Sequence, residues 1–369
     1  MHKLKVENWF MLIGLPMLWA WSFVLLTEPL SKPFPKIKTQ NLLPSELAKP
    51  KLWQSWPSSD PLSLDRLTQH FAQEQAQHSS LLVVGDTRAS ASGLGPSSRW
   101  PSLAHSFKHH NAKVLLHLGD WVQEGQSIHQ WQQSLQSLSL LDPLALLTVK
   151  GNHDRGGLFE TLGLSDVPSA PLRISKVGDM LIFLFDSEVR TEQAQASVEN
   201  LFERGQVKAQ VKTLLQASSA RLWVQHRPIW SSGNHGSDER GWRHWLVPKL
   251  EQLKIDLVLA GHDHDYERFC PSKGVDHLRR CDPHGITYVV SGGGATVTVP
   301  FPNLSWKQST SSKQENDRQR QVFSSRAHYL YIYLAEQKLH LEAWGSEYMG
   351  QRVCFDQAQI PLKMSKFSR

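Results

Sequence analysis

The sequence predicts an α/β fold with a largely parallel, buried sheet. Short apolar runs alternate with longer stretches that suit helices, which is the pattern of consecutive βαβ units. Three of the runs lead through a glycine directly to a polar residue. These runs and their polar residues are 81–84 with Asp86, 113–118 with Asp120, and 144–149 with Asn152.

The remaining elements follow from the same hydrophobic patterning. Helices are expected at 102–110, 127–138, about 194–216, and 241–253. Further strands are expected at 180–186, 221–226, 255–260, 286–291, 328–334 and 338–344. The polar segment 303–327 is expected to be a loop or partly disordered.

The N-terminal residues 1–28 are expected to form a signal anchor or transmembrane helix. Residues 9–26 contain no charged side chain, and as a helix they would extend about 27 Å, close to the thickness of the bilayer's hydrocarbon core. Lys3 and Lys5 precede this segment, as in signal and anchor sequences. We therefore expect an uncleaved, single-pass anchor in the cell membrane. The main domain would lie on the extracytoplasmic side (periplasmic or extracellular), and a secreted protein is the alternative.

Composition sets the other boundaries. Prolines and polar residues dominate 29–78, which predicts a linker, followed by one domain at 79–350 and a C-terminal tail at 351–369.

The chain carries 40 basic and 34 acidic residues, a net charge of +6, without a long basic run interleaved with aromatic residues. Nucleic acid is therefore expected at most as a substrate. The oligomeric state is left open.

Two of the three cysteines, Cys270 and Cys281, bracket a polar segment that is expected to be a surface loop. In an oxidising compartment they would form a disulfide that closes this loop, and two free thiols are the alternative. The sequence contains no CxxC motif, so a cysteine zinc site is not expected.

Polar residues with metal-binding side chains gather at the ends of the predicted strands. In an open parallel sheet the carboxyl ends of the strands border one crevice, where ligands bind. Carboxylate, carboxamide and imidazole groups are ligands of borderline divalent and trivalent metals. Each residue alone has a structural explanation, as a helix cap, a turn residue or a core histidine, but these do not explain the whole ordered set. The set is Asp86, Asp120, Asn152, His226, His262 and His264.

The motifs that carry these residues resemble those of the calcineurin-like metallophosphoesterases. In chain order they are GDTR (85–88), GDW (119–121), GNHD (151–154), WVQHRP (223–228) and GHDHDYER (261–268). HDYER, together with SSGNHG (231–236), is similar to the purple acid phosphatase branch. The resemblance covers about residues 80–345 and implies a four-layer α/β/β/α sandwich.

The resemblance also implies two metal ions, of iron, manganese or zinc. Asp120 would bridge them. One ion would be completed by Asp86 and His264, and the other by Asn152, His226 and His262. His153 would give a proton to the leaving group with Asp154 orienting its ring, and His235 and Arg88 would contact phosphate.

Two positions depart from the family pattern. Many metallophosphoesterases have a histidine where this chain has Arg88, and purple acid phosphatases have a tyrosine where it has Gln123. The purple colour comes from tyrosinate-to-iron charge transfer, so this protein is expected to lack it. The first metal site is left with three obvious protein ligands.

The expected function is hydrolysis of phosphate monoesters by a metal-bridging hydroxide, as in acid phosphatases. One alternative is a phosphodiesterase that acts on nucleotides or lipid headgroups. The other is a non-catalytic binding protein tethered to the membrane. The expected partners are a phosphate-ester substrate and, through the N-terminal helix, the membrane.

Overall fold

The computed structural model describes residues 79–88, 99–138, 145–162, 164, 170–275, 280–295, 319–346 and 352–363, all in one compact unit of the chain. The expected signal anchor and linker lie outside the described residues. Within these ranges, no helix is long and apolar enough to cross a membrane.

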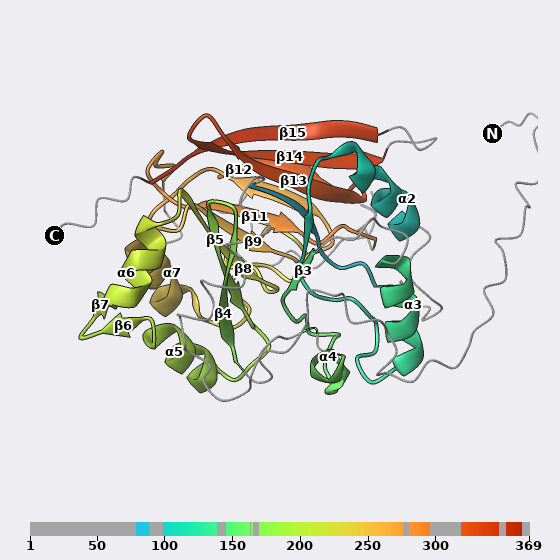
Figure 1. Cartoon of the computed structure of the whole chain (residues 1–369), viewed down its shortest axis with the longest axis horizontal. Coiled ribbons are helices and arrows are strands. Elements are labelled where there is room, and N and C mark those ends of the chain that lie inside the picture. The colour runs from blue at the N-terminus through green and yellow to red at the C-terminus, as the bar shows by residue number, and fades with distance from the viewer. Residues whose placement is uncertain are drawn as a thin grey trace, which may run out of the picture. The chain divides into compact units, whose positions relative to one another are not determined.

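Two large sheets dominate the described part of the chain (Figure 1). The first has the strand order β15 (Arg352–Pro361), β14 (Lys338–Ser346), β13 (His328–Ala335), β1 (Ser80–Val84), β2 (Val114–His117), β3 (Ala145–Thr148). The second has the order β12 (Arg320–Ser324), β10 (Tyr266–Phe269), β11 (Thr287–Ser291), β9 (Leu257–Ala260), β8 (Ala220–Gln225), β5 (Met180–Phe185), β4 (Leu172–Val177). Both sheets are mixed rather than largely parallel, because antiparallel strands flank the parallel groups β1–β2–β3 and β5–β8–β9–β11.

Alternating side chains of the central strands serve two different cores. In β1, Leu81 and Val83 pack in the core between the two sheets, whereas Leu82 and Val84 pack on the outer face. Successive side chains of a strand point to opposite faces, so an unbroken apolar run marks a strand that is covered on both sides. This is why the strand predictions from continuous apolar runs hold.

Helices cover the outer faces of both sheets (Figure 1). Helix α2 (Arg99–Ser106) contributes Trp100 and Leu103 to the core outside the first sheet. The helices α5 (Thr191–Glu199), α6 (Ala209–Gln216) and α7 (Arg243–Gln252) pack outside the second. Two further helices, α3 (Ile128–Leu138) and α4 (Leu158–Thr161), share a smaller core with Trp121. The layers therefore run helix, sheet, sheet, helix, as in the predicted sandwich.

Three predictions about segments are wrong. The expected helix 194–216 is two helices, α5 and α6, separated by the hairpin β6 (Phe202–Glu203) and β7 (Gln206–Val207). Its turn residues Arg204 and Gly205 have positive φ angles of 49° and 77°, which a helix cannot include. The expected loop 303–327 contains β12. The expected C-terminal tail contains β15, an edge strand whose half-exposed side chains give a weak apolar pattern.

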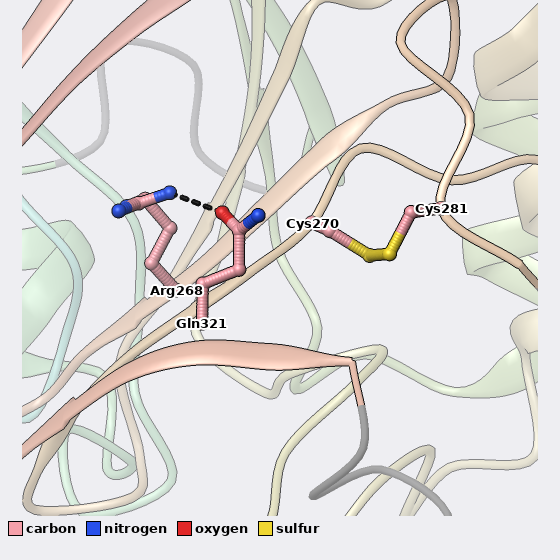
Figure 2. Close-up of a disulfide and its surroundings, with 4 residues drawn as sticks. All are labelled: Arg268, Cys270, Cys281 and Gln321. Carbon is pink, nitrogen blue, oxygen red and sulfur yellow. Dashed lines mark hydrogen bonds between the residues drawn. A yellow bond between two sulfur atoms is a disulfide. The ribbon is translucent and has the colours of Figure 1, made fainter.

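The disulfide between Cys270 and Cys281 is present (Figure 2). Cys270 directly follows β10 and is buried, and the Cα atoms of the two cysteines are 5.5 Å apart. The bond fixes the segment that connects β10 to β11. Beside it, the Arg268 guanidinium donates a hydrogen bond to the Gln321 side chain, joining β10 to β12.

We expect the double substitution Cys270→Ser and Cys281→Ser to lower the free energy of unfolding by about 3 kcal/mol, because a bond that spans 11 residues restricts the unfolded chain. Urea unfolding of both proteins without reductant measures the difference. Cys354→Ser, which removes the free thiol, is the control. A loss below about 1 kcal/mol would show that the loop gains little from its cross-link.

Candidate metal centre

Asp86 and Asp120 lie side by side because β1 and β2 are parallel neighbours. Val84 pairs with His117, so the two strands end side by side at the same end of the sheet. The two turns are then joined by backbone hydrogen bonds, Asp86 N to Gly119 O at 2.9 Å and Arg88 N to Asp120 O at 3.2 Å. Both carboxylates are buried.

The second sheet brings two histidines to the same place. His226 follows β8 and His262 follows β9, which is parallel to β8, and their ring centroids are 5.0 Å apart. His226 Nδ1 lies 2.8 Å from Leu118 O, at the end of β2 in the first sheet. Ligand atoms of Asp86, Asp120 and His226 all lie within 4.8 Å of one another. The carboxyl ends of strands from the two sheets therefore meet at a buried cluster of carboxylate and imidazole groups.

The backbone is strained at three of these residues. Asp86 and Asp120 have φ angles of 56°, and His262 has 73°. Residues other than glycine rarely adopt this left-handed conformation, which costs about 1–3 kcal/mol each and persists where the surroundings impose it. The turns are also tight, because a Cβ on Gly151 would lie 2.2 Å from Asp120 Oδ1. Such clustered strain is typical of functional sites.

One half of the cluster, the His226 half-site, consists of Asp120, Asn152, His226 and His262. His226 Nε2 lies 3.1 Å from Asn152 Oδ1 and 3.5 Å from Asp120 Oδ1. In the neutral ring, Nδ1–H donates to Leu118 O, so Nε2 carries a lone pair. Three acceptor atoms then converge with no hydrogen between them, an arrangement that a cation stabilises.

The other half, the Arg88 half-site, contains Asp86, Asp120, His264 and Arg88. His264 Nε2 lies 3.6 Å from Asp86 Oδ1 and accepts a hydrogen bond from Arg88 Nη2 at 3.1 Å. Arg88 Nε donates to Asp120 Oδ2 at 3.2 Å, and Nη1 donates to Gln123 Oε1. Burial, followed by the charge of Arg88, lowers the pKa of His264 to about 3, which keeps its ring neutral.

Asp86 shows the electrostatic state of this half-site. Burial raises the pKa of Asp86 well above its ordinary range, and the neighbouring carboxylate of Asp120 raises it further. Its Oδ2 atom accepts the backbone N–H of His262 at 2.9 Å. Its Oδ1 atom is buried and has no hydrogen-bond partner among the described residues. A buried carboxylate beside a second carboxylate is stabilised by a positive charge nearby.

Asp154 is buried and binds backbone N–H groups instead of the His153 ring. The prediction that Asp154 orients this ring is therefore wrong. Asp154 accepts with its two oxygens the backbone N–H groups of four residues at 2.8–3.4 Å, namely Asp120, Trp121, Val122 and Gly151. It therefore ties the turn after β2 to the turn after β3. His153 Nδ1 instead lies 2.9 Å from the carbonyl oxygen of Gln123, and its backbone N–H donates to Asp120 Oδ1.

His235 lies over the cluster on an exposed loop. Its ring stacks on His262 with centroids 4.0 Å apart. The loop is held by two buried carboxylates of the GHDHDYER motif. Asp263 accepts the backbone N–H of His235 at 2.8 Å, and Glu267 accepts that of Ser232 at 2.9 Å. Glu267 therefore has a structural role in this loop, next to Tyr266 and Arg268, which both bind Asp356.

Arg227 and Glu239 belong to the site but were missed in the sequence. Glu239 Oε2 lies 2.9 Å from His262 Nε2 and accepts a hydrogen bond from Arg227. Hydrogen bonding to His262 lowers the pKa of Glu239 to about 2, and Arg227 contributes in the same direction. Arg227 also binds Glu188 at 2.7 Å. Its place directly after His226 was a usable signal, whereas nothing around Glu239 in the sequence marks it.

This fold and cluster define a class of protein. Two sheets packed face to face between helices, with carboxylate, carboxamide and imidazole groups at their joined strand ends, are the architecture of a metallophosphoesterase. The family model of calcineurin-like phosphoesterases matches residues 79–266. The chain belongs to the calcineurin-like phosphoesterase family, as its motifs predict.

Curated relatives of the chain include proteins of Arabidopsis thaliana that are named as probable inactive purple acid phosphatases. The chain is 24% identical over 227 residues to "Probable inactive purple acid phosphatase 27" and 22% identical over 219 residues to "Probable inactive purple acid phosphatase 1". The matches cover 54% and 52% of this chain but 37% and 36% of the relatives. The chain thus spans little more than a third of the length of the curated relatives it matches.

Solved structures agree on the fold. Purple acid phosphatase PPD1 from yellow lupin seeds superimposes with a TM-score of 0.53 at 18% identity, covering 77% of this chain and 54% of that one. GAP50, the anchor in the inner membrane complex of Plasmodium, gives 0.54 at 14% identity, with 78% and 90% covered. At these identities the two matches show a shared fold.

Proposed function

We propose that the protein hydrolyses phosphate monoesters at a metal centre held by Asp120, Asn152, His226 and His262. The observation that carries this proposal is the convergence of the Asp120 and Asn152 side-chain oxygens on His226 Nε2. Two oxygens and imidazole nitrogens suit zinc, manganese or ferrous iron. When bound, such an ion supplies a Lewis acid for the phosphoryl group and an activated water.

The protein's own groups orient this centre. Leu118 O holds the Nδ1 hydrogen of His226 and so fixes the tautomer that leaves Nε2 free for a ligand bond. Glu239 and Arg227 hold the ring of His262, because Glu239 Oε2 lies 2.9 Å and Arg227 Nη1 lies 3.2 Å from its Nε2 atom. The His153 backbone N–H fixes the Asp120 carboxylate.

His153 and His235 are the side chains we assign to the substrate. His153 is half-buried beside Asp120, and the Gln123 carbonyl holds its Nδ1 hydrogen, which leaves Nε2 for the leaving-group oxygen. His235 is exposed on the rim of the cluster, stacked on His262, where it can contact a phosphate oxygen. The monoester preference is supported by the purple acid phosphatase relatives.

We expect His153→Ala to lower kcat about 100-fold for an alkyl phosphate, the order of a lost general acid. The loss should be much smaller for p-nitrophenyl phosphate, because nitrophenolate leaves readily without a proton. Steady-state kinetics with the two substrates measure the difference. Equal losses for both substrates would contradict a role in protonating the leaving group.

Metal analysis combined with hydrolysis assays tests the proposed function. The metal-loaded chain is assayed with p-nitrophenyl phosphate and with bis-p-nitrophenyl phosphate. Faster cleavage of the monoester supports the proposal, whereas faster cleavage of the bis-ester favours a phosphodiesterase of nucleotides or lipid headgroups. Bound metal with turnover of neither substrate favours a non-catalytic binding protein. The names of the curated relatives, which contain the word "inactive", are a reason to test this alternative.

We also propose that the phosphoesterase domain is exported, tethered by a membrane anchor within residues 1–28 and a linker over 29–78. The Cys270–Cys281 disulfide supports export, because such bonds persist in oxidising compartments. A fusion reporter that is active only in the cytoplasm gives no signal under this proposal. Reporter activity would contradict it.

A further inference from the structure

The two departures from the family pattern, Arg88 and Gln123, contact each other. The Arg88 guanidinium donates through Nη1 to the Gln123 side chain, although 35 positions separate them in the chain. Both stand where the resemblance places ligands of the first metal, histidine at one position and tyrosine at the other. The two changes therefore affect one place in the site and form a single hydrogen-bonded unit.

This unit occupies two of the metal-ligand atoms of the Arg88 half-site. Arg88 Nε donates to Asp120 Oδ2 at 3.2 Å, and Nη2 donates to His264 Nε2 at 3.1 Å. These are the oxygen and the nitrogen that a first ion would need. The Arg88 side chain is 10% exposed, so its charge is held inside the site rather than in solvent.

A guanidinium and a metal ion cannot use His264 Nε2 together. This atom has one lone pair, and while the lone pair accepts the Arg88 hydrogen it is not free for a bond to a metal at about 2.0–2.2 Å. Arginine stays protonated in proteins, so it cannot release the acceptors by losing its charge. A divalent cation beside it would also meet a fixed like charge in a partly buried site. The Arg88 half-site therefore does not fit a metal ion.

We propose that the guanidinium of Arg88 replaces the first metal ion, so that this phosphoesterase works with a single ion in the His226 half-site. The inference rests on the proposed function. Arg88 supplies the positive charge that neutralises the Asp120 carboxylate at its Oδ2 atom. Asp86 then acts as a positioning residue, because its Oδ2 atom holds the backbone N–H of His262 in the left-handed conformation.

The number of bound ions tests this directly. The full chain is stripped with a chelator, equilibrated with excess Mn²⁺, freed of unbound ion and measured by elemental analysis. We expect one ion per chain in the wild type, two in Arg88→His, and one in the control Arg190→His, which changes an exposed arginine. Electron paramagnetic resonance should show an isolated Mn²⁺ ion in the wild type and a spin-coupled pair in Arg88→His.

The outcomes separate the two proposals. Two ions in the wild type would overturn the replacement by Arg88 and leave the proposed function intact. No bound ion in the wild type would overturn both. One ion in an Arg88→His variant that unfolds at the wild-type temperature would also count against the inference, because something other than the guanidinium would then exclude the second ion.

A colour change provides a second, independent readout. In the double variant Arg88→His and Gln123→Tyr, loaded with ferric ion, we expect the visible absorption of tyrosinate-to-iron charge transfer. Gln123→Tyr alone should stay colourless, because the guanidinium still occupies the half-site. Colour in the single variant, or none in the folded double variant, would contradict the proposal.

Discussion

Replacing His226 with alanine should abolish metal binding and phosphoester hydrolysis together. His226 is completely buried, and its Nε2 is the atom on which the Asp120 and Asn152 oxygens converge. Loss of a residue that only orients a ligand costs 10–100-fold in metal affinity or activity. Loss of a ligand itself should cost more, and we expect kcat/KM to fall at least about 1000-fold.

Elemental analysis and hydrolysis of p-nitrophenyl phosphate, carried out on the same preparation, measure both effects. His129→Ala is the matched control, because His129 is an exposed histidine on α3 whose side chain contacts Gln133. It should retain both metal and activity. Full turnover by a metal-free His226→Ala protein would show that catalysis does not depend on this centre.

Asp154→Ala is expected to destabilise the fold by at least about 3 kcal/mol. The carboxylate accepts four backbone N–H groups, from Gly151, Asp120, Trp121 and Val122. Alanine would leave these buried donors without an acceptor, and each unsatisfied group costs about 1–3 kcal/mol before relaxation. Asp154→Asn keeps one acceptor oxygen but turns an N–H towards the donors, so we expect an intermediate loss.

Urea unfolding with a chelator present measures this effect, since metal binding would otherwise add to the apparent stability. Asp179→Ala removes an exposed aspartate and should change the free energy of unfolding by less than about 0.5 kcal/mol. A loss below about 1 kcal/mol in Asp154→Ala would mean that water or a rearranged turn satisfies the four donors.

The sequence was sufficient to place the main side chains of the site. Asp86, Asp120 and His226 each follow an apolar run, and parallel strands that end at one edge of a sheet must bring such residues together. The structure does so, because β1 pairs with β2 and β8 pairs with β9. Strand placement was predictable where a strand is a continuous apolar run, as in β1 and β5.

Contacts that depend on side-chain direction were not predictable. Asp154 and His153 are neighbours in the chain, yet one binds backbone N–H groups of two turns and the other faces the Gln123 carbonyl. The reach of Arg88 to His264 spans 176 positions and depends on how the two sheets meet. The edge strand β15 was missed because a strand with half-exposed faces lacks a continuous apolar run.

Anomalous diffraction from crystals of the protein grown with Mn²⁺ tests the central claim most directly. We expect a strong peak bounded by Asp120, Asn152, His226 and His262, at the joined carboxyl ends of the two sheets. A map whose strongest peak lies elsewhere, or that has no peak between these four side chains, would contradict it.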